Sequence, residues 1–182
     1  MQAQPKTIRD ILYTGDQYII PLFQRYYSWE KSHWERLRLD VWNLFENGAK
    51  PVHFLGPLVC HLPFKMPGST ASFQLIDGQQ RLTTLTIMLA AIRDVAQARG
   101  LDNLADEVTE DYLLFKRKQG SDRYKVLPRL GDREVLTAMV EGHDLAQYVE
   151  SRVHAAWKYF QRHVQHLSRK DTEKQLRKLL DI

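Results

Sequence analysis

Residues 74–84 read QLIDGQQRLTT, and this stretch decides the fold that we predict. The apolar run Phe73–Ile76 is typical of a short buried strand. From Leu82 onward, apolar residues recur every three or four positions, as they do on one face of a helix. The stretch therefore predicts a strand, a tight turn at Gly78 and a long helix that Gly100 can end. Such a turn directs the first helical amides and the positive end of the helix dipole at one place, where anions collect.

The same stretch has a second, purely structural interpretation. Asp77 and Gln80 stand at the spacing of a capping box, in which Asp77 accepts from the first helical amides and Gln80 reaches back. Capping gives no reason for Gln79. It also gives none for Arg81, a cation that the helix dipole disfavours by roughly 0.3–1 kcal/mol. We therefore expect Arg81 to face an anion, which is either a protein carboxylate or a bound ligand.

Two earlier stretches complete a recognisable set. Residues 20–29, IPLFQRYYSW, place four aromatic rings around the polar pair Gln24 and Arg25, and residues 54–59 read FLGPLV. Most of the rings are expected to fill the core, whereas Arg25 is expected to stack, pair or bind a ligand. With IDGQQRLTTL at 76–85, these stretches resemble, in order, the signature of the GmrSD-type restriction endonuclease N-terminal domain family, within the wider ParB/sulfiredoxin-like group. The resemblance thins beyond about Tyr112.

This resemblance implies a nucleotide-binding and NTP-hydrolysing domain of a DNA restriction or phage-defence protein, with Mg²⁺ or another divalent cation as cofactor. In the implied site Asp77 holds the metal ion, while Arg25 and Arg81 neutralise phosphate charge. Gln79 or Gln80 orients a water. A composite site is needed, because a helix terminus contributes at most ~2 kcal/mol and micromolar binding needs about 8 kcal/mol. The other expected phosphate-binding residues are Gln24, Gly78 and Thr83.

Two other functions stay open. A non-catalytic DNA-binding or regulatory module would use the same anion pocket to bind backbone phosphate. A ParB-like nuclease would cut the phosphodiester itself. Against a two-metal nuclease, Asp77 has no second carboxylate near it in the sequence. The expected partners are thus a nucleotide and, through the full-length protein, DNA.

Composition limits the remaining possibilities. The 182 residues suit one domain, or one domain with a helical extension. The hydrophobic content of 43% and the mean hydropathy of −0.45 are those of an ordinary soluble protein. No apolar run approaches about 18 residues and the start lacks a signal-peptide core, so we expect a cytoplasmic protein without a membrane partner. The single Cys60 excludes a disulfide framework and a cysteine zinc site.

The net charge of +4 is concentrated toward the end of the chain. Residues 151–182 contain eight Lys or Arg and three acidic residues, which indicates a solvated helix face or a contact with DNA. His163 and His166 stand at a spacing that a metal ion could use, but an exposed polar face explains them better. The candidate DNA contacts are Arg169, Lys170, Lys174, Arg177 and Lys178.

The whole chain is predicted to be α+β, with a small mixed sheet of ParB/sulfiredoxin-like type in residues 1–100 and a helical extension in residues 101–182. A helix left open at Ile182 suggests a longer protein, and members of the resembled family often continue into an HNH-type nuclease. Thr7, Ser32 and Asp102 are expected to cap helices. The expected strands are 17–20, 53–62, 72–76 and 124–127, and the expected helices are 7–12, 32–48, 82–100, 102–118, 132–140, 145–159 and 172–180. The expected core stripe of helix 32–48 is Trp34, Leu37, Val41, Leu44 and Phe45.

Overall fold

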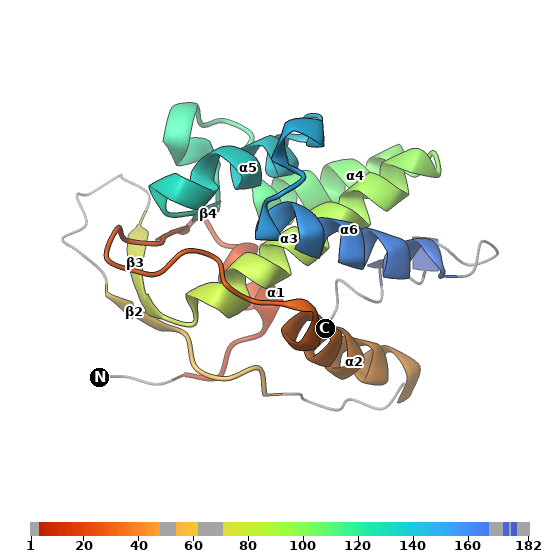
Figure 1. Cartoon of the computed structure of the whole chain (residues 1–182), viewed down its shortest axis with the longest axis horizontal. Helices are drawn as coiled ribbons and strands as arrows, with labels where there is room; N and C mark the ends of the chain where they lie inside the picture. Colours follow the sequence, from red (N-terminus) through yellow and green to blue (C-terminus); the bar gives the residue numbers. More distant parts are fainter. Residues whose placement is uncertain (1–3, 48–53, 62–70, 168–172, 175, 178–182) are drawn as a thin grey trace.

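The structure, a computed structural model, describes residues 4–47, 54–61, 71–167, 173–174 and 176–177. Its architecture is α+β, as predicted, with helices packed around a small sheet (Figure 1). In the described part of the chain the sheet has four strands in the order β2-β3-β1-β4. Strand β1 runs parallel to β3 and to β4, whereas β2 runs antiparallel to β3. The strands are β1 (Gln17–Ile19), β2 (Val59–His61), β3 (Ser72–Asp77) and β4 (Val126–Leu127).

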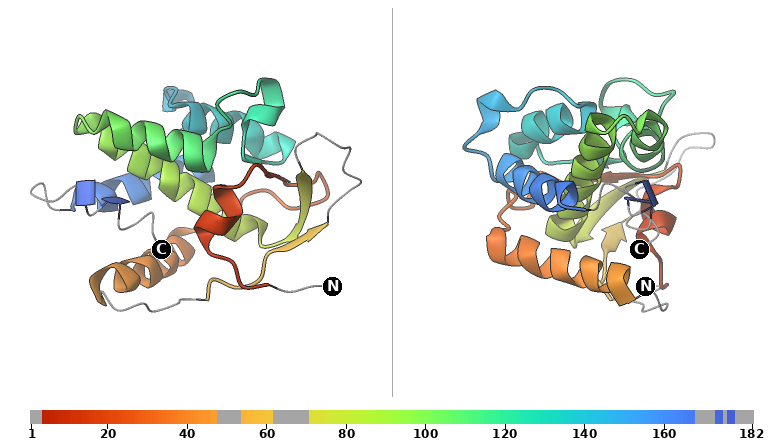
Figure 2. Two further views of the ribbon diagram at one scale, coloured as in Figure 1. Left: turned by 180° about the vertical axis from the view of Figure 1, so that it is seen from behind. Right: turned by 90° about the vertical axis from the view of Figure 1, so that its right-hand side faces the viewer.

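Helix α3 (Gln79–Ala98) is the centre of the molecule. Sixteen of its 20 residues are buried, because neighbouring helices cover it on several sides. Figures 1 and 2 show α6 against one side of α3 and α4 against another. The other helices are α1 (Ile8–Leu12), α2 (Lys31–Asn47), α4 (Asp102–Val108), α5 (Leu130–Glu141) and α6 (Arg152–Gln165), with short helical turns η1 (Thr109–Leu113), η2 (Gly120–Arg123) and η3 (Ala146–Tyr148).

The sheet and the hydrophobic core draw on residues from both sides of Gly100. Strand β4 pairs with β1, so that Tyr18 stands opposite Val126. The core cluster includes Ile92 of α3 and Phe160 of α6, both fully buried. In the tail, Leu176 is also fully buried in this cluster.

Three connections leave the sheet at one edge, because the carboxyl ends of parallel strands lie on the same side. Strand β3 leads through Gly78 directly into α3, and β4 leads through Pro128 and Arg129 into α5. The loop that follows β1, residues 20–30, starts at this edge as well. In open α/β sheets ligands bind outside this edge, so the topology favours a ligand site here.

Two predicted helix caps differ from the structure. Helix α2 begins at Lys31, and the backbone N–H groups of His33 and Trp34 donate to the carbonyl of Glu30, so Ser32 lies inside the first turn and is not its cap. Asp102 is the first residue of α4 and not its cap. The cap of α1 is confirmed, since Thr7 and Asp10 form a capping box. The stripe residues Trp34, Leu37 and Val41 are buried as predicted, whereas the side chains of Leu44 and Phe45, and Gly48, lie outside the described residues.

Other predicted elements are shorter than expected. The helix from residue 102 continues as a π-helical turn and ends at Leu113, not Lys118. The stretch 145–159 is divided at Ser151, which caps α6 after the 3-10 turn η3. Of the residues predicted as strand 53–62, the structure describes 54–61, and among these the strand is Val59–His61. Gly56, with a φ of +95°, and Pro57 do not suit a regular strand.

Candidate functional site

Asp77 ends β3 and does not cap α3. The residue at the N-cap position is Gly78, which adopts the left-handed conformation with a φ of +89°, and no side chain of the described residues caps the helix. This positive φ favours glycine, and a Cβ at residue 78 would in addition come within 2.3 Å of a methyl carbon of Leu58. The Asp77 side chain is 65% exposed, and its nearest charged partner is Arg81 at 3.7 Å. The capping-box interpretation is therefore wrong, and the Asp77 carboxylate stays accessible beside free first-turn amides.

Arg81 connects the second family motif, residues 54–59, to the third, residues 76–85. Its Nη1 donates to the carbonyl of Leu55 at 2.7 Å and its Nη2 to that of Pro57 at 2.8 Å. The guanidinium lies directly over Gly56, where a Cβ would be only 1.9 Å from Nη1. The acceptors of this cation are thus mainly backbone carbonyl oxygens, and not only the carboxylate or ligand anion that the sequence led us to expect. These bonds use two of its five donors.

Gln80 connects the first family motif, residues 20–29, to the third, residues 76–85. Its side chain is buried, its Oε1 accepts from the backbone N–H of Ser28 at 2.8 Å, and its Nε2 donates to the carbonyl of Tyr26 at 3.1 Å. One turn further along α3, the hydroxyl groups of Thr84 and Tyr27 lie 2.8 Å apart. These contacts fix residues 26–28 against the start of α3.

The polar pair of the first motif lies at the end of β3. Gln24 donates from Nε2 to the carbonyl of Ile76 at 2.8 Å, which brings the loop next to Asp77. Arg25 is exposed and makes no hydrogen bond or ion pair with the described residues. The structure thus brings Gln24 into contact with the third motif and leaves Arg25 available to a ligand.

Two further expected site residues are buried. Gln79, the first residue of α3, is 7% exposed, yet its side chain has no hydrogen-bonding partner in the described parts of the chain. A buried amide without a partner costs roughly 1–3 kcal/mol, so a ligand or water that satisfied it would recover that energy. Thr83 is also buried and makes no side-chain hydrogen bond with the described residues.

The start of α5 adds residues that the sequence interpretation missed. Arg129 donates to the carbonyl of Gln24 at 2.7 Å, and its guanidinium carbon lies 3.9 Å from the centre of the Tyr26 ring. Asp132 accepts from the backbone N–H of Tyr27 at 2.8 Å. Burial raises the pKa of Asp132, and the Tyr27 hydrogen bond opposes this. The available signal was Pro128-Arg129 directly after a predicted strand, the same strand-turn-helix order as at Asp77.

The electrostatic character of this edge follows from these contacts. The N-termini of α3 and α5 both lie here, and neither has a side-chain cap in the described structure. Arg25 and Arg129 add positive charge to this edge, and Asp77 is an exposed carboxylate that lies 3.7 Å from Arg81. Backbone amides, helix dipoles and arginines favour an anion with several negative charges, such as a phosphate chain.

The candidate DNA contacts of the tail are only partly described. Lys174 is exposed, whereas Arg177 pairs with Glu107 of α4 and with Glu173. Both acids raise the pKa of Arg177 through hydrogen bonds. Arg169, Lys170 and Lys178 lie outside the described residues. Within the described ranges, no group of three or more His, Cys, Asp or Glu could hold a metal ion, including around His163 and His166.

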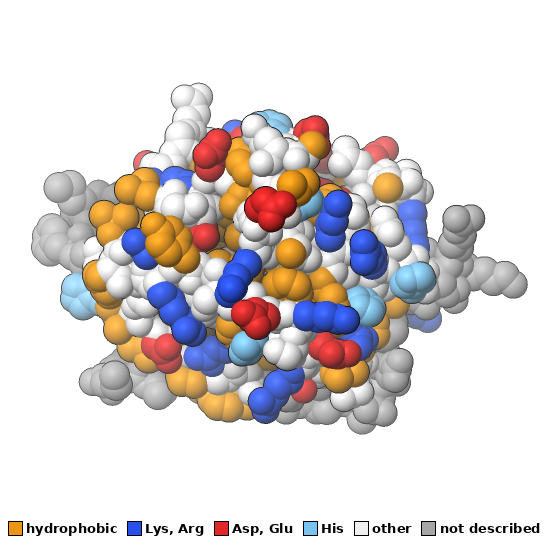
Figure 3. Space-filling model, in the orientation of Figure 1, with side chains coloured by type: hydrophobic (Ala, Val, Ile, Leu, Met, Phe, Trp, Pro, Cys, Tyr) orange, Lys and Arg blue, Asp and Glu red, His pale blue; other side chains and the backbone are white. Residues whose placement is uncertain are grey.

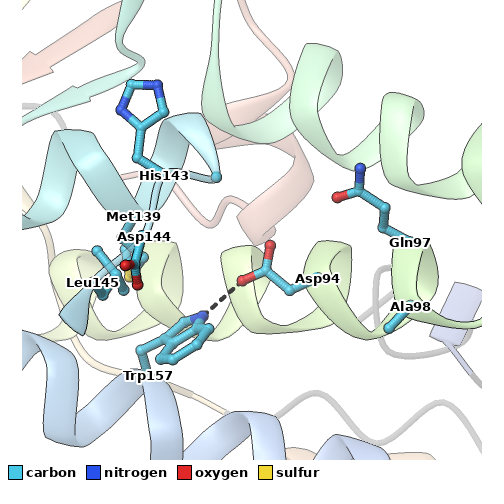
Figure 4. A pocket seen from close by; sticks show the side chains of 9 residues that line it. Asp94, Gln97, Ala98, Met139, His143, Asp144, Leu145 and Trp157 are labelled. Carbon is cyan, nitrogen blue, oxygen red and sulfur yellow. Dashed lines mark hydrogen bonds between the residues drawn. The ribbon is translucent and has the colours of Figure 1, made fainter.

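A separate cavity of about 430 Å³ lies near the other end of α3 (Figure 4). Asp94 borders it, and its two carboxylate oxygens accept from Arg93 Nε and from Trp157 Nε1, each at 2.7 Å. Arg93 in turn donates to the carbonyls of Met139 and Val140 at the end of α5. This network ties α3, α5 and α6 together, which gives the polar groups of the cavity a structural role.

The fold and this edge define an α+β domain with two helix N-termini at the carboxyl ends of parallel strands. Residues 8–182 match the family described as GmrSD restriction endonuclease, N-terminal domain, and the chain belongs to that family. The match continues well beyond Tyr112, where the motif resemblance thins. Membership gives the chain a DNA-related role in restriction or phage defence. None of the curated proteins matches the chain.

None of the described helices is both long enough and apolar enough to cross a membrane.

Proposed function

We propose that the chain is the nucleotide-binding and NTP-hydrolysing part of a DNA restriction or phage-defence protein. One observation carries the proposal: three motifs of the family are joined at one sheet edge around an exposed carboxylate, Asp77, and around the N-terminus of α3, which no side chain of the described structure caps. A motif with a purely structural role would be expected to use Asp77 as the helix cap, and Asp77 does not do so.

The phosphate chain would lie against the first turn of α3. The backbone amides of Gln79, Gln80 and Arg81 have no partner among the described residues, since the first such bond of the helix is that of Leu82 to Gly78. Arg25 would add a charge-assisted hydrogen bond to the same phosphates. Arg81 holds residues 55–57 in place and still has donors for the ligand.

The residues present fit a divalent cation at Asp77. Mg²⁺ is commonly held by one or two carboxylates together with phosphate oxygens and several waters, so a single exposed aspartate suffices. When bound, Mg²⁺ would neutralise charge on the phosphate chain. Gln79, whose buried amide has no partner among the described residues, would hold the attacking water.

The test compares Asp77→Asn and Asp77→Ala in the full-length protein. Because Asp77 is exposed and does not cap α3, both variants should keep the melting temperature of the wild type. NTP turnover with Mg²⁺ should collapse in both, because the amide and the methyl group lack the charge that holds the ion. Full turnover in Asp77→Asn would contradict the proposal and would favour a binding module.

The alternative, a DNA-binding or regulatory module, is favoured by α6. This helix carries Arg152, Lys158 and Arg162 and contains no acidic residue. Figure 3 shows Lys and Arg side chains distributed over the face that carries α2 and α6. The salt dependence of DNA binding tests this alternative.

A further inference from the structure

The loop after β1 and the start of α5 expose apolar side chains next to the candidate site. We define the aromatic patch as Leu22, Phe23, Tyr26 and Leu130, which are 61%, 73%, 54% and 59% exposed. Apolar side chains gather over these elements at the left of Figure 3, with Lys or Arg among them. Of the four rings in residues 20–29, Tyr27 is buried and Trp29 packs partly buried against the core, as expected, whereas Phe23 and Tyr26 are exposed.

The patch is held in place and does not hang free in solvent. The Tyr26 ring stacks under Arg129 and lies so close to Gly131 that a Cβ there would be 1.9 Å from Tyr26 Cε1. The carbonyl of Tyr26 accepts from Gln80 and that of Gln24 accepts from Arg129. Phe23 therefore projects from a loop whose backbone is fixed by α3 and α5.

Contacts connect the patch to the phosphate end of the site. Phe23 precedes Gln24, whose side chain bonds the carbonyl of Ile76, the residue before Asp77. Leu130 is the first residue of α5, whose N-terminus has no side-chain cap in the described structure. The loop that carries the exposed Phe23 ring is thus bonded to the end of β3 and to Arg129 before α5, a combination that suits a planar π system joined to negative charge.

We propose that Phe23, supported by Tyr26 and Leu130, is the surface on which the base of the bound nucleotide stacks while its phosphates lie at the start of α3. This inference rests on the proposed function and adds the base-binding part of the site. Every nucleobase has a π face, so the patch contributes affinity without selecting one base. Arg25 and Arg129 beside the rings disfavour a basic partner and favour this polyanionic one.

The experiment measures the Kd of two probes for the full-length protein with Mg²⁺ by titration calorimetry. The probes are inorganic tripolyphosphate, which has phosphates and no base, and the tightest-binding member of ATP, GTP, CTP and UTP. Phe23→Ala should weaken nucleotide binding by roughly tenfold to a hundredfold and leave the tripolyphosphate Kd unchanged. Phe23→Trp should retain nucleotide binding. Tyr13→Ala, which removes another ring that is 51% exposed, is the control and should change neither Kd.

The outcomes separate this inference from the proposed function. If the wild type binds both probes and Phe23→Ala changes neither Kd, or weakens both equally, the base does not stack on Phe23 and the patch serves another partner. If the wild type binds neither probe, the proposed function fails and the base-binding role fails with it.

Discussion

The guanidinium of Arg81 occupies the space that a side chain at Gly56 would need. The two residues come from different family motifs, and their close approach explains why the FLGP stretch contains a glycine at this point. The carbonyls on both sides of Gly56 accept hydrogen bonds from Arg81, so the arginine holds the backbone of residues 55–57 in place. The helix dipole disfavours a cation at the start of α3, and the hydrogen bonds from Arg81 to the carbonyl oxygens of this loop offset that cost.

Gly56→Ala should destabilise the protein for two reasons, the strain of a positive φ in the backbone and the clash of the new methyl group with Arg81. A left-handed φ costs a non-glycine residue about 1–2 kcal/mol, and the new methyl group must also displace Arg81 from its two hydrogen bonds. Gly120→Ala is the matched control, because Gly120 also has a positive φ, of +58°, but no atom lies within 4 Å of its Cβ position. Urea unfolding should show a larger loss for Gly56→Ala. In an Arg81→Ala background the loss should shrink, and equal losses in both backgrounds would contradict the contact.

Replacing Gln79 and replacing Gln80 by Ala should change the free energy of unfolding by different amounts, although both residues are 7% exposed. Gln80→Ala leaves the Ser28 N–H without its acceptor, which should cost about 1–3 kcal/mol of unfolding free energy. Gln79→Ala breaks no hydrogen bond among the described residues and removes an unpartnered buried amide, so its melting temperature should equal or exceed that of the wild type while NTP turnover falls. A Gln79→Ala protein that is as unstable as Gln80→Ala would show that Gln79 has a structural role.

Lys125 should make the protein more stable as the pH rises from about 8 to 10. Its ammonium group donates to the carbonyls of Leu12 at 2.6 Å and Asp111 at 2.5 Å. Burial lowers its pKa to about 8, with the Asp111 carboxylate opposing this and Lys118 adding to it. Below pH 8 both states hold the proton. Between the folded and unfolded pKa values only the unfolded chain holds it, so stability rises with pH, by an amount on the order of 1 kcal/mol.

The measurement is the unfolding free energy of wild type and Lys125→Met at pH 7.5, 8.5 and 9.5. The difference between the two proteins removes the effects of other groups, such as Cys60, whose pKa burial raises. The stability of each protein taken alone falls with pH above about pH 10, because burial raises the pKa of Tyr18 to about 12 and the tyrosine of the unfolded chain ionises first. Parallel pH profiles for both proteins would show that Lys125 does not titrate in this range.

Basic residues of the C-terminal part should divide into two groups in a DNA-binding assay. Lys158, Arg162 and Lys174 are exposed, so replacing each by Ala should flatten the log–log salt slope by up to about 0.9 per lost phosphate contact. Arg177 is paired with Glu107 and Glu173, so Arg177→Ala should leave the slope unchanged. It should instead lower stability slightly, by at most about 1 kcal/mol, because these pairs are partly exposed. A slope that responds to Arg177→Ala as strongly as to Lys174→Ala would contradict this division.

Local pattern was sufficient to predict the strand-turn-helix around Asp77, because the change from a short apolar run to a helical period at a glycine is contained in a dozen residues. It was not sufficient to identify the partners of the polar side chains. The acceptors of Arg81 depend on where β2 pairs with β3, and the contacts of Arg129 and Asp132 depend on β4 pairing with β1. The capping box failed for the same reason, since Gln80 found its partners in residues 26–28. The ParB/sulfiredoxin-like relationship and the metal ion stay predictions.

The position of β1 between β3 and β4 has a consequence for how the chain folds during synthesis. One side of β1 can pair only after Ser72, the partner of Gln17, has been synthesised. The other side can pair only after Val126, the partner of Tyr18, has been synthesised. Until α6 has also left the ribosome, the apolar surface of α3 lacks one of its covers. Contacts of such long sequence separation slow folding and expose hydrophobic surface in the interval. Nascent chains that stop before α6 should therefore need chaperones and should aggregate when these are withheld.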